Sequence, residues 1–166
     1  MIKKLLNKLV DKYLFKNTKY VRFNFIKNWL LDLKPNSKIL DAGAGLMRYK
    51  SFCTHLNYQS QDFGGYTGGE TFEGFRTKEW RSKECDLICD ITSLPVADAT
   101  YDFILCSDVF EHLPNPEAAL KELSRVLKKG GDILVTSPFR CFYHQPPFFF
   151  FSGFSKYWFE RISASE

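Results

Sequence analysis

The segment KILDAGAG (residues 38–45) decides the fold, because it predicts a short buried strand that runs directly into a tight glycine turn. Gly43 and Gly45 allow backbone dihedrals that other residues avoid, and they let the main chain approach a ligand closely. A glycine pair alone is more often an ordinary turn. The interpretation of this segment therefore depends on the pattern around it.

Short apolar runs alternate with turns and helical patterns along the rest of the chain, which is typical of a parallel sheet flanked by helices. The predicted strands are Lys38–Asp41, Tyr58–Asp62, Asp86–Asp90, Phe103–Ser107 and Asp132–Ser137. The predicted helices are Val21–Leu33, with Phe25, Ile26, Trp29, Leu30 and Leu33 on its apolar face, and Pro116–Lys128, ended by Gly130 and Gly131. Residues 64–81, rich in glycine and charge, are predicted to form a long functional or mobile loop.

Length and charge predict one α/β domain with a basic leader. A chain of 166 residues, 45% of them hydrophobic, is long enough to bury one core. Residues up to Lys38 carry ten Lys or Arg against two Asp, whereas the remainder is net acidic. We predict an amphipathic helical leader at 1–34 and a folded domain at 35–166. The helix expected at Ile2–Phe15 packs on the domain, or else contacts an anionic membrane or RNA.

The cysteines and the apolar runs restrict the class further. Five cysteines occur without a CxxC pair, so we predict neither a disulfide framework nor a metal site. No apolar run approaches the roughly 18 to 20 residues that cross a bilayer, and no signal peptide is recognisable. We therefore expect a soluble, cytoplasmic protein.

Acidic residues end two of the predicted strands. Ligands of an open parallel sheet bind beyond the carboxyl ends of its strands. Adenosine needs carboxylates for its ribose hydroxyls and an acceptor for its amine. Asp62 follows the glycine turn by about twenty residues, where a ribose-binding carboxylate belongs, and Asp90 ends the third strand.

Three segments resemble the class I S-adenosylmethionine-dependent methyltransferases, in particular their type 11-like domains. ILDAGAG (residues 39–45) resembles their cofactor-binding turn, and LICDITSLP (residues 87–95) resembles their third-strand segment. YDFILCSDVFEHLPNPEAALKELSRVLKKGG (residues 101–131) resembles their fourth strand, the helix after it and its glycine stop. The match covers roughly Pro35 to Glu160. Nicotinamide dehydrogenases share the glycine turn but not the fourth-strand segment.

This resemblance implies S-adenosylmethionine as the cofactor and a Rossmann-like three-layer sandwich with a mostly parallel sheet. It also implies a set of cofactor-binding residues: Asp41, Ala42, Gly43 and Gly45 at the methionine portion, Asp62 and Phe63 at the ribose, Asp90 and Ile91 at the adenine, and Ser107 and Asp108 on the pocket floor.

The chain departs from the family in three places. Lys129 stands at the usual proline position before Gly130 and Gly131, a change with little expected consequence. Met47 stands where a third glycine is frequent. The family's sheet has seven strands, but no strand pair is recognisable after Ser137, so we expect five strands ordered 3-2-1-4-5 without the C-terminal antiparallel hairpin. The fifth strand is then an open edge, which suggests a homodimer or a truncated gene product.

Methyl transfer to oxygen needs a base beside the acceptor. The candidates are Glu111, His112, Tyr143 and His144, with His144 preferred; the alternative for Glu111 and His112 is that they cap the following helix or fix the cofactor loop. The resemblance implies that the aromatic run at residues 146–160 lines the acceptor pocket. Alternatively, Phe148–Phe151 form an exposed apolar patch, or the rings fill the core. We favour the core for Trp158 and Phe159. Ser152 or Ser155 is expected to cap a terminal helix.

We predict that the protein transfers a methyl group to a small molecule, a glycan or a lipid precursor. The alternatives are a non-catalytic remnant that binds the cofactor or a partner, and, less favoured, an RNA methyltransferase.

Overall fold

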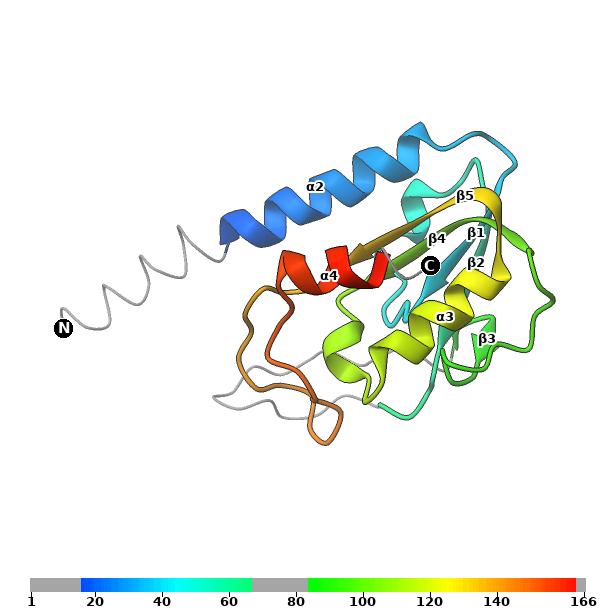
Figure 1. Cartoon of the computed structure of the whole chain (residues 1–166). Coiled ribbons are helices and arrows are strands. Elements are labelled where there is room, and N and C mark those ends of the chain that lie inside the picture. The colour runs from blue at the N-terminus through cyan, green and yellow to red at the C-terminus, as the bar shows by residue number, and fades with distance from the viewer. Residues whose placement is uncertain (1–15, 67–83, 164–166) are drawn as a thin grey trace.

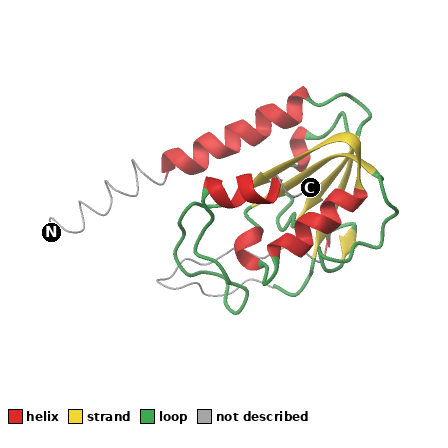
Figure 2. Ribbon diagram, in the orientation of Figure 1, coloured by secondary structure: helices red, strands yellow, loops and turns green. Residues whose placement is uncertain are grey.

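The computed structural model describes residues 16–66 and 84–163. The predicted helix at 2–15 and most of the predicted loop at 64–81 lie outside these residues. Figure 2 shows the secondary structure. The elements, with one-turn 3-10 helices marked η, are α2 (Lys16–Asp32), β1 (Lys38–Ala42), η2 (Lys50–Phe52), β2 (Asn57–Asp62), β3 (Leu87–Ile88), β4 (Tyr101–Ser107), η5 (Phe110–His112), α3 (Pro116–Val126), β5 (Leu127–Thr136) and α4 (Lys156–Ser163).

The five strands form one sheet in the order β3-β2-β1-β4-β5, and every strand pair in it is parallel. This order confirms the predicted topology. Within the described part of the chain, no strand follows β5, and β5 pairs with β4 alone. The carboxyl ends of β1, β2 and β4 therefore meet at one edge, where the cofactor residues are expected.

Helices cover both faces of the sheet. Neighbouring residues of β1 point to opposite faces: Ile39 packs with Ile26 and Leu30 of α2, whereas Leu40 packs with Leu123 of α3. Figure 1 shows α2 on one side of the sheet and α3 with α4 on the other. This arrangement confirms the predicted three-layer α/β sandwich. None of the helices in residues 16–66 and 84–163 is long and apolar enough to span a membrane.

Helix α2 differs from its prediction at its start and on one face. It begins at Lys16 rather than Val21. Phe25, predicted on the apolar face, is 58% exposed, because Ile26 and Leu30 define the buried line of the helix and Phe25 lies about 100° from Ile26. Phe23 packs inward instead and stacks on Tyr49, with ring centroids 5.7 Å apart.

The segment after α3 also differs from its prediction. The helix ends at Val126 and not at Lys128, since Leu127 has extended dihedrals (φ −80°, ψ 138°) and begins β5. Gly130 and Gly131 therefore lie within a strand irregularity and do not end the helix. The register between β4 and β5 shifts at these glycines: Leu127 pairs with Tyr101 before them, and Asp132 pairs with Phe103 after them.

Strand β3 is shorter than predicted and stops at Ile88. Asp86, the predicted first residue, directs its carboxylate across to Ser60, whose backbone N–H and hydroxyl donate to it at 2.8 and 2.7 Å. Asp90, the predicted last residue, forms its own turn, because its Oδ1 accepts from the N–H of Thr92 at 2.8 Å. Both carboxylates thus take up bonds outside the strand ladder.

Candidate cofactor and active site

The glycine turn after β1 is held by the end of β2. The Gly45 N–H donates to Asp62 Oδ2 at 3.0 Å, and the Gly64 N–H donates to Asp62 Oδ1 at 3.1 Å. Gly43 and Gly45 both have positive φ, at 72° and 50°, so the turn uses conformations that favour glycine. The Asp62 carboxylate is therefore directed at the glycine turn.

Gln61 is a site residue that the sequence analysis missed. It is buried, its Oε1 accepts from the Gly43 N–H at 3.1 Å, and its Nε2 donates to the Cys89 carbonyl at 2.7 Å. One amide thus ties the glycine turn to the segment that leads into Asp90. A polar residue beside Asp62 at a buried end of β2 is the sequence signal that identifies it.

Asp41 is a buried carboxylate beside this turn. Its Oδ2 accepts from the Tyr58 hydroxyl at 2.6 Å. Burial raises the pKa of Asp41 to about 6, the Tyr58 hydrogen bond opposes the rise, and the charge of Asp62 adds to it. The end of β1 therefore carries a carboxylate whose charge is costly until a positive group lies beside it.

The predicted adenine residues follow β3. Asp90 is exposed and accepts from both the N–H and the hydroxyl of Thr92 through Oδ1, at 2.8 and 2.7 Å. Ile91 is buried in the core cluster that includes α3. Phe63, after β2, packs edge-on against Phe148, with ring centroids 4.8 Å apart.

Ser107 ends β4, Asp108 follows it, and an arginine of α2 pairs with Asp108. The Ser107 and Thr136 hydroxyls are hydrogen-bonded at 2.8 Å, and the Asp108 N–H donates to the Thr136 carbonyl at 2.8 Å. Arg22 pairs with Asp108 Oδ2 at 2.5 Å. Burial raises the pKa of Asp108, and the charges of Arg22, Arg48 and Lys19 oppose this. Arg22 was not predicted, since nothing in its helix indicates that α2 reaches β4.

The chemistry of this edge fits S-adenosylmethionine. That molecule presents a sulfonium, an ammonium, two ribose hydroxyls and an exocyclic amine. The edge presents the carboxylates of Asp41, Asp62, Asp90 and Asp108 next to a turn of two glycines. Asp108 Oδ1 is buried and has no hydrogen-bond partner among the described residues, which leaves an acceptor open. The individual contacts of the ten predicted cofactor residues stay predictions.

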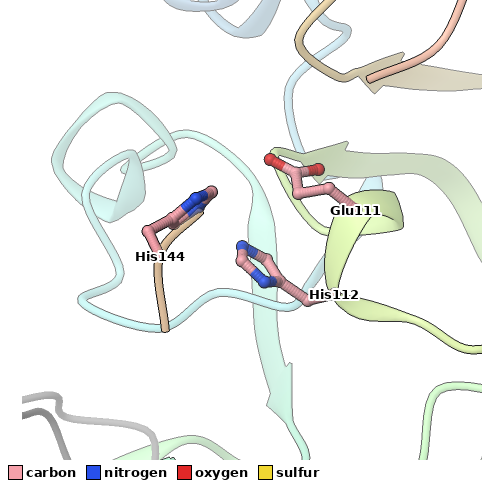
Figure 3. Close-up of side chains that lie close together, drawn as sticks. All are labelled: Glu111, His112 and His144. Carbon is pink, nitrogen blue, oxygen red and sulfur yellow. The ribbon is translucent and has the colours of Figure 1, made fainter. Parts of the chain in front are cut away.

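The structure brings three of the four predicted catalytic residues together. Glu111 and His112 lie in η5 and His144 lies in the loop after β5, and Figure 3 shows their side chains around a common space. The ring centroids of His112 and His144 are 4.8 Å apart. Tyr143 is 54% exposed and packs against Phe149, with ring centroids 5.4 Å apart, so it lies beside this cluster and not in it.

Glu111 and His112 do not cap the following helix. Asn115 is the N-cap of α3, and its Oδ1 accepts from the Ala118 N–H at 3.1 Å. The helix-cap alternative for these two residues is therefore wrong. Burial raises the pKa of Glu111 to about 7, with the nearby charge of Asp108 adding to it, and burial lowers the pKa of His112 to about 4.

The aromatic run divides into a core part and an exposed part. Trp158 and Phe159 pack against Phe110 with ring centroids 5.9 and 6.5 Å apart, as predicted. Ser155 caps α4, because its Oγ accepts from the Trp158 N–H at 3.3 Å. Of Phe148–Phe151, only Phe150 is exposed, so the exposed apolar patch expected there is not formed. Three other exposed rings, Phe139, Phe142 and Tyr143, precede the run in the loop that carries His144.

Comparison with known proteins places this site in a family. Residues 40–135 match the family model described as "Methyltransferase domain". A Mus musculus protein named "Probable tRNA methyltransferase 9B" is 31% identical over 114 residues, which is 66% of this chain and 24% of the mouse protein. A Corynebacterium urealyticum protein named "Demethylmenaquinone methyltransferase" is 30% identical over 107 residues, 63% of this chain and 43% of that protein. The chain thus spans about a quarter of the length of the mouse relative.

Solved structures agree on the fold. A SAM-dependent methyltransferase from Aquifex aeolicus superposes with a TM-score of 0.56 at 18% identity, covering 81% of this chain and 73% of the other. The methyltransferase class and S-adenosylmethionine as methyl donor, both predicted above, are confirmed at the level of the family. The glycine turn, the directed carboxylates and the family match over residues 40–135 together show that the chain belongs to the class I S-adenosylmethionine-dependent methyltransferases.

Proposed function

We propose that the protein transfers the methyl group of S-adenosylmethionine to a hydroxyl of a small molecule, a glycan or a lipid precursor. The observation that supports this most directly is the Asp62 carboxylate, which accepts from the Gly45 N–H at 3.0 Å and so lies at the glycine turn. In this proposal residues 35–166 form the methyltransferase domain, and residues 1–34 form its helical leader, whose α2 segment packs on the sheet.

The chain's own residues position the reactants. When bound, S-adenosylmethionine supplies an electrophilic methyl group on a sulfonium. Asp41 and Asp62 bind and orient its cationic and hydroxyl groups, and Asp90 with Ile91 holds the adenine. Positioning of this kind contributes most to a direct displacement, because the acceptor atom must lie in line with the methyl group.

The acceptor hydroxyl has to lose a proton. Glu111 suits this task, since burial raises its pKa to about 7 and it exchanges protons near neutral pH. His112 and His144 lie beside it and complete the proposed catalytic cluster. Tyr143, on the surface next to the cluster, contributes to the acceptor wall in this proposal.

The exposed rings favour an acceptor with apolar surface. Phe139 and Phe142 are 80% and 76% exposed in the loop that carries His144. Such rings bind apolar or planar parts of a ligand. A second candidate is RNA, because the mouse relative carries a tRNA methyltransferase name and the first 38 residues hold ten Lys or Arg. We place it second, because the basic residues are concentrated in the leader.

Two measurements test the proposal. Titration calorimetry with S-adenosylmethionine is expected to show stoichiometric binding, and absence of binding contradicts the cofactor assignment. Transfer of labelled methyl groups is then followed into a set of hydroxylated metabolites and lipids and, separately, into total RNA. Label in the first set supports the proposal, label in RNA alone supports the second candidate, and binding without transfer supports a non-catalytic protein.

A further inference from the structure

We propose that Glu111, His112 and His144 form a binding site for a divalent first-row transition-metal ion. Each residue offers one ligand atom, and these atoms all lie within 4.8 Å of one another. Figure 3 shows the carboxylate and both imidazoles facing the same space. Two imidazoles and one carboxylate are a common ligand set for Zn²⁺ and Fe²⁺ in enzymes. This proposal revises the sequence prediction of no metal site.

Hydrogen bonds fix both imidazoles in the form that binds a metal. His112 Nδ1 lies 2.6 Å from the Phe148 carbonyl, and His144 Nδ1 lies 2.8 Å from the Phe142 carbonyl. A carbonyl oxygen only accepts, so Nδ1 carries the hydrogen in each ring and Nε2 keeps its lone pair. Metal-binding histidines usually have this arrangement, in which the second nitrogen donates to a backbone carbonyl or a carboxylate.

Glu111 supplies the negative ligand, a role that replaces the one of general base proposed for it above. It is 2% exposed, and its Oε2 is buried without a hydrogen-bond partner among the described residues. A buried carboxylate oxygen left unpaired is costly unless a cation or a donor comes to it.

The distances require only a small closure. Ligand atoms bonded at about 2.1 Å to one tetrahedral ion lie roughly 3.4 Å apart. The ligand atoms here lie within 4.8 Å of one another, so a shift of at most about 1.4 Å brings them into range. His144 is the ligand best placed to move, since it is only half-buried and lies in a loop.

The site deepens the proposed function and rests on it in one respect, the identity of the acceptor. Three protein ligands leave a coordination position open for an acceptor oxygen. A metal-bound hydroxyl loses its proton to water or to a base near neutral pH. The oxygen then forms a bond to the methyl carbon as the carbon–sulfur bond breaks, which leaves the neutral thioether S-adenosylhomocysteine. The acceptor class is therefore an alcohol or a phenol.

The chain has only three histidines, so nitrogen NMR of histidine-labelled wild-type protein tests the site directly. His55 is the internal control, because its Nε2 lies 3.2 Å from the Leu33 carbonyl and it is expected to have the opposite tautomer. On adding Zn²⁺ under reducing conditions, the Nε2 signals of His112 and His144 are expected to shift and those of His55 to stay. Unshifted signals, or an equal shift of all three histidines, overturn the proposal.

Variants give a second measurement. Co²⁺ is titrated into the wild type, His144→Gln, Glu111→Gln and the control His55→Gln, with folding checked by circular dichroism. The first two substitutions are expected to weaken Co²⁺ binding at least about tenfold, and the control is expected to bind as the wild type does. A thiolate-to-cobalt charge-transfer band, or equal affinity in all four proteins, overturns the proposal. S-adenosylmethionine affinity measured in the presence of a chelator separates this outcome from failure of the methyltransferase assignment.

Discussion

The imidazole of His144 lies edge-on against that of His112, with ring centroids 4.8 Å apart and an interplanar angle of 84°. His112 ends η5, the short helix that follows β4, whereas His144 lies in a loop that closes on itself through two backbone hydrogen bonds. The Cys141 N–H donates to the Ser152 carbonyl at 2.6 Å, and the Phe154 N–H donates to the Pro138 carbonyl at 2.9 Å. The approach of the two rings therefore depends on this loop, residues 138–154.

Gly153 is the residue on which the loop's closure depends. Its φ is 150°, and a Cβ added there lies 2.1 Å from the Phe139 carbonyl oxygen. Gly153→Ala is expected to lower the free energy of unfolding by about 2 to 4 kcal/mol and to displace His144. Denaturant unfolding and the histidine NMR signals measure the two effects.

Gly130→Ala is the matched control for this substitution. Gly130 also has a positive φ, 77°, but a Cβ added there has no atom within 4 Å. Only backbone strain remains, which costs about 1 to 2 kcal/mol. Equal losses in the two variants, or an unchanged His144 signal in Gly153→Ala, would contradict the role given to the loop.

Asp62 is predicted to couple the glycine turn to the cofactor. Asp62→Asn weakens hydrogen bonds from the N–H groups of Gly45 and Gly64 and removes a charge. Hydrogen bonds to charged groups contribute about 1.5 to 3 kcal/mol, so S-adenosylmethionine is expected to bind roughly 10- to 100-fold more weakly. Calorimetry measures the change.

Asp102→Asn provides the comparison. The Asp102 carboxylate also accepts two hydrogen bonds, from the Lys38 backbone N–H at 2.8 Å and from the Lys128 ammonium at 2.7 Å. Because Lys38 is the first residue of β1, Asp102 lies at the opposite end of the sheet from the glycine turn. Its substitution is expected to leave cofactor affinity within about twofold of the wild type. An equal loss in both variants would mean that the effect is one of stability alone.

The cofactor edge was predicted from local signals, whereas the strand order was predicted from the resemblance to the methyltransferase family. The run at 38–45 combines a buried strand with glycines, and the structure places Asp62 on that turn. Arg22 and the joining of Glu111 with His144 were not predicted, because they connect segments whose distance depends on tertiary packing. The end of α3 was wrong because the glycine pair after it belongs to the pairing of β5 with β4.

Met47 gives a prediction about backbone strain just after the glycine turn. Its φ is 49°, in the left-handed region, which costs a side-chain-bearing residue about 1 to 2 kcal/mol. Met47→Gly relieves this strain, and the relief partly offsets the stability that is lost with the half-buried side chain. The neighbouring Leu46 is similarly buried but is not among the residues with positive φ, so Leu46→Gly has no such relief. Thermal unfolding is expected to show Met47→Gly as the more stable variant by about 1 to 2 kcal/mol, and the reverse order would contradict the strain.

Asp41 gives a prediction about pH. Its folded-state pKa is about 6, above its ordinary value of 3.8, because burial disfavours the charge. The folded protein therefore binds this proton more tightly than the unfolded chain, so the contribution of Asp41 to stability rises as pH falls from about 6 to about 4. Above about pH 6 the charge destabilises the fold by about 3 kcal/mol, the free energy of a shift of about two pKa units.

Asp41→Asn is accordingly expected to increase the free energy of unfolding at neutral pH by about 2 to 3 kcal/mol, since the amide oxygen still accepts from Tyr58. The same variant is expected to bind S-adenosylmethionine more weakly, because a carboxylate facing a cation is lost. Asp86→Asn has the opposite sign of effect on stability, since the backbone N–H and hydroxyl of Ser60 lower the pKa of Asp86 and favour its charged form. Unfolding curves measured across pH 4 to 8 test both predictions. If Asp41→Asn is less stable than the wild type at neutral pH, the Asp41 charge stabilises the fold, and the proposal that this charge is unfavourable until a cationic cofactor binds is wrong.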